Sequence, residues 1–348
     1  MLRSDRVDIR KLNPSFEYID GKAGDIVQFG NYPQSIALPG YEDCMQYDSD
    51  KKLFHCSADD CFYVKIEAKP YQPLFLNERY CFHSKKVVET GKAYFFKFEP
   101  INWIVLQSSA HTKFLLSEKV IDSKLYLEPK FVGKPRVDGY PNKYYPGVDR
   151  AFPNTWEYST LRAWLNGTHT YQHKKNFFNF AFTREEQGKI KTVQLKNDPN
   201  SSGIRDPSAY SWLHQRDTKD KVFCLSVAEA TSYIFHKDPK MKDSEICDPS
   251  IKGRAAEVTD YAIASGVCPY YIEGTIIGWW WLRSPGDPAE HEVTLYNKSK
   301  APVCQKRACD VTEDGHICQR ASIVCGSEED TCDGSANGIR PAIKVEFE

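Results

Sequence analysis

Two short segments near the C-terminus constrain the fold of this chain more than any others. Residues 278–286 read GWWWLRSPG, and residues 338–343 read GIRPAI. Three consecutive tryptophans are rarely found on a solvated surface, because large aromatic side chains gain free energy when they leave water. An arginine and a proline then follow in each segment. We therefore predict that the two segments form adjacent core strands that close one domain, with residues 286–337 between them as an exposed loop region.

Apolar runs predict further strands earlier in the chain. Residues 26–29 are typical of a first strand, and Gly30, Asn31 and Pro33 indicate a turn directly after it. Other core strands are predicted at residues 94–98, 101–107 and 222–226, with residues 114–117 as the hairpin partner of 101–107.

Short helices are predicted from their capping residues. Ser159 can cap a helix that carries Trp164 on its apolar face. Two further helices open with Ser or Thr followed three residues later by Glu, which is the capping-box pattern. These pairs are Thr183 with Glu186 and Ser226 with Glu229, and a third helix is expected to begin after Thr259. Strands and helices are mixed without regular strand–helix alternation, which predicts an α+β fold.

The domain organisation follows from composition along the chain. Residues 1–24 form a polar N-terminal lead-in, and residues 25–348 are predicted to form a single domain. Residues 35–92 read as a β-rich insertion, because they hold four cysteines and a proline-rich stretch without helical periodicity. The second long excursion is the loop at 286–337, which holds five more cysteines.

The chain has 12 cysteines, but their spacing argues against a structural zinc site because the sequence contains no C-x2-C pair. Free thiols are the favoured interpretation, and some disulfides are the alternative. The 20 tyrosines, 19 phenylalanines and 7 tryptophans predict a large aromatic core, with an aromatic-rich binding face as the alternative.

The charge and hydropathy of the chain restrict its partners. The formal net charge is -1, so no overall field favours nucleic acid or an anionic membrane. The longest apolar run, near residues 276–282, is far shorter than the roughly 20 residues that a membrane helix needs. The N-terminal residues lack the apolar stretch of a signal peptide, which predicts a cytoplasmic protein, or a secreted or surface protein if a leader was removed.

The order of the motifs FGNYPQ, PINWIVL, FLLS, TWEYSTLRAWLNG, VFCLS, WWLRSPG and GIRPAI resembles a bacterial family of domains of unknown function. That family is similar to the C-type-lectin fold in its formylglycine-generating-enzyme-like branch. The resemblance runs from about Asp25 to the C-terminus. It implies mixed or antiparallel sheets with a few short helices and long loops.

The resemblance also implies where a ligand would bind, because loops between the closing strands form the binding surface in that fold. The predicted binding residues are Asp287, Glu290, His291, Glu292, Tyr296 and Asn297. The predicted structural core contains Trp103, Trp164, Trp280, Arg283 and Arg340. The two arginines have a structural interpretation, in which they hold buried carbonyls or a carboxylate, and an alternative as an anion clamp.

The sequence lacks a P-loop, a dinucleotide-binding motif and a nucleophile elbow, and no metal site or cofactor is predicted. We therefore predict a non-enzymatic binding module that recognises a protein or a glycan through the loop face. One alternative is a copper- and thiol-dependent oxidase related to formylglycine-generating enzymes, with Cys318 and Cys325 as its pair. Another is a structural component of a surface or phage-like assembly.

Overall fold

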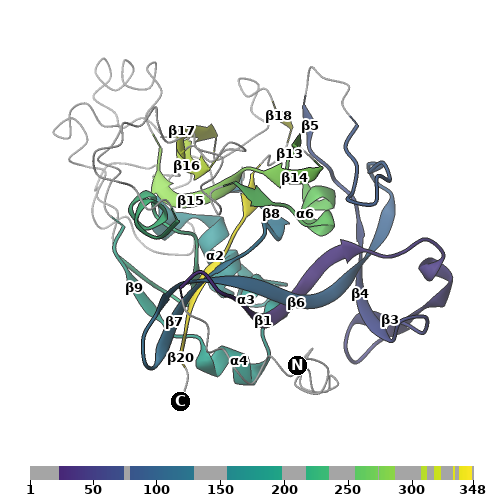
Figure 1. Cartoon of the computed structure of the whole chain (residues 1–348), viewed down its shortest axis with the longest axis horizontal. Helices are drawn as coiled ribbons and strands as arrows, with labels where there is room; N and C mark the ends of the chain where they lie inside the picture. Colours follow the sequence, from purple (N-terminus) through teal and green to yellow (C-terminus); the bar gives the residue numbers. More distant parts are fainter. Residues whose placement is uncertain are drawn as a thin grey trace.

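The computed structural model describes residues 23–73, 79–128, 155–197, 217–234, 255–272, 274–286, 307–311, 317–322, 332–333 and 337–346. These residues form a strand-rich α+β fold with short helices, as predicted (Figure 1). An eight-stranded sheet and a five-stranded sheet hold most of the described strands, and almost all of their pairings are antiparallel.

The eight-stranded sheet has the order β11-β20-β7-β6-β4-β3-β2, and β1 also pairs with β6. The strands are β1 (Ile26–Ile36), β2 (Met45–Asp48), β3 (Leu53–Cys56), β4 (Cys61–Glu67), β6 (Ala93–Ser108), β7 (Thr112–Ser117), β11 (Val222–Phe223) and β20 (Ala342–Glu346). Alternate residues of β6 are buried, which is the period-two pattern of a strand with one face on the core.

The two strands predicted at 94–98 and 101–107 are one continuous strand, β6, so the expected break is wrong. Strand β4 pairs with residues 93–97 of β6, and β7 pairs with residues 103–108. Pro100 lies between these two pairings, and it is the register partner of Asn31 in β1, next to a register shift of that ladder, where a proline is tolerated in a sheet. The hairpin of β6 with β7 is present as predicted.

The turn predicted after residue 29 is also wrong, because β1 continues to Ile36. The register of β1 against β6 shifts twice along its length, and Gly30 has a φ of 69°. The strand is therefore bulged, which lets it bend without ending. A side chain at Gly30 would meet the ring of Phe182 at 2.6 Å, so this position also needs glycine for close packing.

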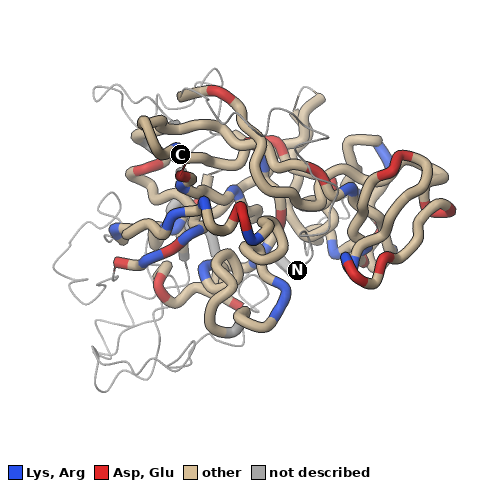
Figure 2. Tube along the Cα trace, turned by 90° about the horizontal axis from the view of Figure 1, so that it is seen from below, with Lys and Arg blue, Asp and Glu red and all other residues tan. Residues whose placement is uncertain are grey.

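The predicted insertion continues the main sheet outward. Strands β2, β3 and β4 form a lobe that projects from the rest of the described chain (Figures 1 and 2). A small apolar cluster of Ala37, Cys56 and Tyr63 fills this lobe. Acidic and basic residues are mixed along its trace in Figure 2.

The five-stranded sheet has the order β17-β16-β15-β19-β8. The strands are β8 (Asp122–Ser123), β15 (Trp280–Pro285), β16 (Arg307–Val311), β17 (Ile317–Ser322) and β19 (Gly338–Ile339). Trp280 pairs with Gly338, so the two closing segments are adjacent strands, as predicted. The segment between them is not only an exposed loop, because β16 and β17 form a hairpin that extends the sheet from β15.

The final segment belongs to both sheets. Strand β19 ends before Arg340, and β20 begins after Pro341 in the other sheet. The Arg340 side chain donates from Nε to the carbonyl of Ser117 at 2.8 Å, and its guanidinium lies 5.1 Å from the Trp280 ring centroid. Burial lowers the pKa of Arg340 to about 9. All five residues predicted for the core are buried: Trp103, Trp164, Trp280, Arg283 and Arg340.

The described α-helices are α2 (Thr160–Asn166), α3 (Phe177–Ala181), α4 (Arg184–Lys189), α5 (Val227–Glu229) and α6 (Asp260–Ser265). All of the predicted N-caps are present. Ser159 and Thr259 accept from the backbone, and Thr183 and Ser226 form complete capping boxes. None of the helices in the described ranges is long and apolar enough to cross a membrane.

Candidate functional site

The residues predicted to bind a ligand lie outside the described part of the chain. They are Asp287, Glu290, His291, Glu292, Tyr296 and Asn297. A described piece of the same segment, β18 (Cys332–Asp333), pairs with β5 (Gln72–Pro73) in the insertion (Figure 1). Because Gln72 lines a large pocket, residues 332–333 lie at the rim of that pocket.

This pocket has a volume of about 590 Å3. It lies where the insertion around β5, the turn after β8, helix α2, the short helix η5 (His169–Tyr171) and the end of α6 meet. We call it the aromatic pocket, and six of its lining residues define it: Lys69, Tyr71, Lys124, Glu128, Trp164 and Tyr171.

Helix α2 and the short helix η5 after it each place one aromatic side chain in the pocket. Trp164 is 5% exposed and packs on Phe177, with ring centroids 5.7 Å apart. Gly167 ends the helix in the left-handed conformation, with φ of 62°. The chain then enters η5, which carries Tyr171 to the pocket. The Tyr171 hydroxyl donates to a carboxylate oxygen of Glu128. Burial makes the larger contribution to raising the pKa of Tyr171, and this hydrogen bond makes the next.

A buried carboxylate fixes the ammonium group of Lys124 at the pocket wall. Lys124 Nζ lies 3.0 Å from Asp122 Oδ1 and 2.9 Å from the Ser123 carbonyl. It also lies 5.0 Å from the Trp164 ring centroid, which is a cation–π distance. The Tyr32 hydroxyl donates to the other Asp122 oxygen at 2.5 Å. Burial, and then the charge of Asp122, raises the pKa of Tyr32.

The insertion supplies the opposite rim and is tied to the core there. The Lys69 N–H donates to the Ala264 carbonyl of α6 at 2.7 Å. Gln72 Nε2 donates to Thr90 Oγ1 at 2.6 Å. Half-buried Tyr71 lies between these contacts, with its ring centroid 6.2 Å from that of Tyr80. The rim is therefore held by bonds on both sides of Tyr71.

Arg283 does not line this pocket, and its guanidinium donates to neighbouring residues. Its Nε donates to Asn197 Oδ1 at 3.0 Å, and Nη1 donates to the Cys224 carbonyl at 3.0 Å. Nη2 donates to Glu229 Oε1 at 3.0 Å and to the Lys196 carbonyl at 3.3 Å. These contacts match the structural interpretation of Arg283, because a clamp for an external anion needs donors that face outward.

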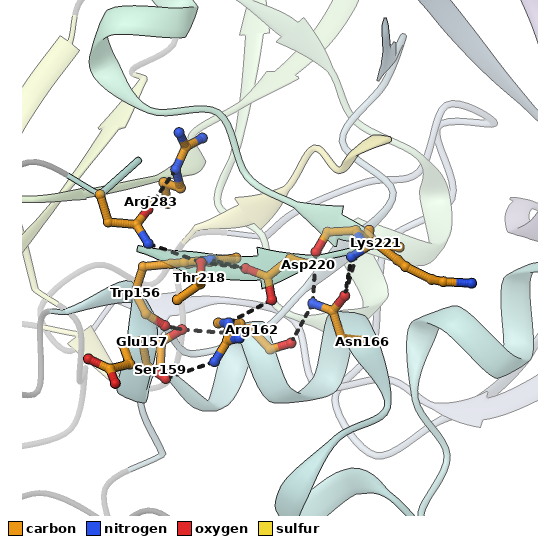
Figure 3. Close-up of polar contacts among 11 residues, drawn as sticks. Trp156, Glu157, Ser159, Arg162, Asn166, Thr218, Asp220, Lys221 and Arg283 are labelled. Carbon is orange, nitrogen blue, oxygen red and sulfur yellow. Dashed lines mark hydrogen bonds and ion pairs between the residues drawn. The ribbon is translucent and has the colours of Figure 1, made fainter. Parts of the chain in front are cut away.

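The network continues from Arg283 to helix α2 (Figure 3). Asn197 Nδ2 donates to Thr218 Oγ1 at 3.0 Å, and Thr218 donates to Asp220 Oδ2 at 2.7 Å. Asp220 also accepts from Trp156 Nε1 at 2.9 Å and from Arg162 Nε at 2.7 Å. Arg162 belongs to α2, so this network joins the tryptophan strand to the helix that carries Trp164.

A second cleft, of about 510 Å3, lies at the other end of α6. His83 of the insertion makes two contacts there, from Nδ1 to Asp260 Oδ1 at 2.7 Å and from Nε2 to Glu257 Oε1 at 3.1 Å. The hydrogen bond to Asp260 and, by a smaller amount, the hydrogen bond to Glu257 raise the pKa of His83 to about 9. His83 is therefore a charged link between the insertion and α6 at neutral pH.

Cysteine chemistry was the basis of the predicted alternative as an oxidase. Cys318 lies on β17 opposite Asp310, and Cys325 is outside the described residues. Within the described ranges, no three His, Cys, Asp or Glu side chains are grouped so that they could hold a metal ion. Six described cysteines are free thiols: Cys44, Cys56, Cys61, Cys81, Cys224 and Cys268.

Among the residues that define the aromatic pocket, only Trp164 was predicted from a local sequence pattern. Tyr71, Lys124, Glu128 and Tyr171 come from segments without a local motif, and only the fold brings them together. The abundance of tyrosine gave a general indication of such a site, because an aromatic-rich binding face was the alternative interpretation of the aromatic content.

Comparison with protein families matches residues 111–347, about two thirds of the chain, to a family described as a domain of unknown function, DUF6273. No curated protein and no solved structure matches the chain.

Proposed function

We propose, from the premise that the chain belongs to the DUF6273 family, that it is a non-enzymatic binding module whose ligand site is the aromatic pocket. The observation that carries this proposal is the lining of that pocket. It combines the rings of Tyr71, Trp164 and Tyr171 with fixed polar groups on Lys124 and Glu128. Ligand sites in proteins are typically concave, apolar and aromatic, with a few positioned polar groups.

A saccharide unit is the ligand class that best suits this lining. A sugar ring presents C–H groups on its faces and hydroxyl groups around its edge. The half-buried rings of Tyr71 and Tyr171 offer apolar area for the faces. The ammonium of Lys124 is a donor and the carboxylate of Glu128 is an acceptor, so together they can hold hydroxyl groups in both hydrogen-bonding roles.

The location of the pocket supports the same proposal. Its floor comes from residues within 111–347, which match the family, whereas Lys69 and Tyr71 come from the insertion that precedes the match. In this proposal the family domain supplies a lectin-like scaffold of the C-type kind. The insertion and strand β18 then supply the rim that sets specificity, because β5 and β18 pair there.

A glycan array followed by calorimetry tests the proposal. The substitutions Tyr171→Ala and Glu128→Gln should each weaken binding of any glycan hit by about tenfold or more, because each removes a central contact. Tyr47→Ala is the matched control, since Tyr47 is 58% exposed on β2 of the projecting lobe. Retention of full affinity in both pocket variants, or binding of proteins and no glycan, would contradict a saccharide site at this position.

A further inference from the structure

Three lysines lie within or directly after segments that line the aromatic pocket. Lys69 lines the pocket, and Lys174 Nζ lies 5.7 Å from the ring centroid of the lining residue Tyr171. Lys175 follows directly, with its Nζ 4.0 Å from the centroid of Phe180. All three residues are exposed, and none makes an ion pair with any residue that the structure describes.

Two carboxylates at or beside the pocket already have partners. Glu128 accepts from the Tyr171 hydroxyl. Asp122 is 1% exposed and accepts from Lys124, Tyr32 and the Ser123 N–H. These two carboxylates are therefore engaged by nearby donors, whereas the three lysines form no ion pair with any described residue.

The charges also influence one another across the mouth. Desolvation by the groups around its ammonium lowers the pKa of Lys175, the negative charge of Asp122 raises it, and the positive charge of Lys124 lowers it by a smaller amount. An anionic group bound near these lysines would gain favourable charge interactions, because a pocket edged by charge of one sign concentrates ligands of the other.

We propose that the aromatic pocket selects saccharides that carry a negatively charged substituent, and this inference rests on the proposed function. The rings and the Lys124–Glu128 pair hold the sugar, while Lys69, Lys174 and Lys175 attract its anionic group. Lysine is a point charge on a flexible stem and lacks the planar fork of arginine, so the site accepts a carboxylate or a sulfate.

The test compares matched pairs of probes by calorimetry: glucose with glucuronic acid, and N-acetylglucosamine with its 6-sulfate. The acidic member of each pair should bind at least about tenfold more tightly at low salt, and this preference should shrink at 0.5 M salt because exposed charges are screened. Each single variant, Lys69→Gln, Lys174→Gln and Lys175→Gln, should weaken acidic binding by about two- to fivefold. The triple variant should bind both members of a pair equally.

A charge-matched control distinguishes the effect of these three lysines from the effect of the net charge of the chain. The triple variant of Lys52, Lys65 and Lys85 to Gln removes the same net charge at residues that do not line the pocket, and it should keep the preference. An equal loss in the control, or equal binding of neutral and acidic sugars by the parent chain, overturns charge selection and leaves the proposed function standing. Binding of none of the four probes, together with no hit on a glycan array, overturns both.

Discussion

Asp220 is 2% exposed, and its carboxylate accepts hydrogen bonds from three side chains. These donors are Trp156 and Arg162, which come from the segment that forms α2 and the turn before it, and Thr218, which lies on the same strand as Asp220. A buried carboxylate of this kind is stabilising only while all its donors are present, because each buried polar group needs a partner. Asp220 therefore holds helix α2 in place beneath the aromatic pocket.

The substitution Asp220→Asn should lower the free energy of unfolding by about 2–4 kcal/mol, because it leaves the guanidinium of Arg162 without a counter-charge in a buried site. Denaturant unfolding measures this free energy. Asp60→Asn is the control, since Asp60 is 92% exposed and pairs with His55 at the surface. Its expected effect is within about 0.5 kcal/mol, and comparable losses in the two variants would contradict a special role for Asp220.

His83 makes stability depend on pH in a defined window. Its pKa is raised from 6.5 to about 9 by Asp260 and Glu257, so its stabilising contribution is fully present below about pH 6.5 and is lost as pH rises through 9. The variant His83→Gln should therefore melt at a lower temperature than the parent at pH 6, and the difference should narrow at pH 10. A difference that stays constant between these pH values would show that the charge of His83 is not involved.

Helix α2 illustrates which elements can be predicted from sequence. Its cap at Ser159, its buried Trp164 and its stop at Gly167 are all local signals, and all three are present. The bulge that carries β1 past Gly30 and the continuity of β6 through Pro100 depend on partners far away in sequence. At these two places, sheet pairing therefore determines the backbone conformation despite the local turn signals.

Gly167 provides a test at the level of this element. Its φ is 62°, and an added Cβ would lie 2.7 Å from Asn176 Oδ1. The substitution Gly167→Ala should destabilise the protein by about 1–2 kcal/mol, through the strained backbone and the close contact. Gly188→Ala in α4 is the control, because nothing lies within 4 Å of its Cβ position and alanine favours a helix. Denaturant unfolding should show no loss for the control, and equal losses would contradict the account of Gly167.

The C-terminal segment connects the two large sheets, because it contributes a strand to each. Strands β19 and β20 belong to different sheets, and buried Arg340 lies at the crossing against Trp280. Both closing segments and their adjacency were predicted from the tryptophan run and from the apolar residue, arginine and proline that the two segments share. The split at Arg340 was not predicted, since nothing local indicates that the strand changes sheets.

The aromatic pocket is also a property of the whole molecule. Its walls come from an insertion, a turn, two helices and the end of a third, which are separated by up to about two hundred residues. Sequence reasoning placed the site in the segment 286–337 by resemblance, and the pairing of β18 with β5 brings part of that segment to the rim. The tyrosines and lysines of the pocket could not be grouped before the fold was known.

A crystal structure of the chain with its tightest-binding saccharide tests the central claim most directly. We expect the sugar in the aromatic pocket, with a ring face against Tyr71 or Tyr171 and hydroxyl groups hydrogen-bonded to Lys124 and Glu128. A saccharide bound at the second cleft beside His83, or on the projecting lobe, with the aromatic pocket empty, would contradict the account.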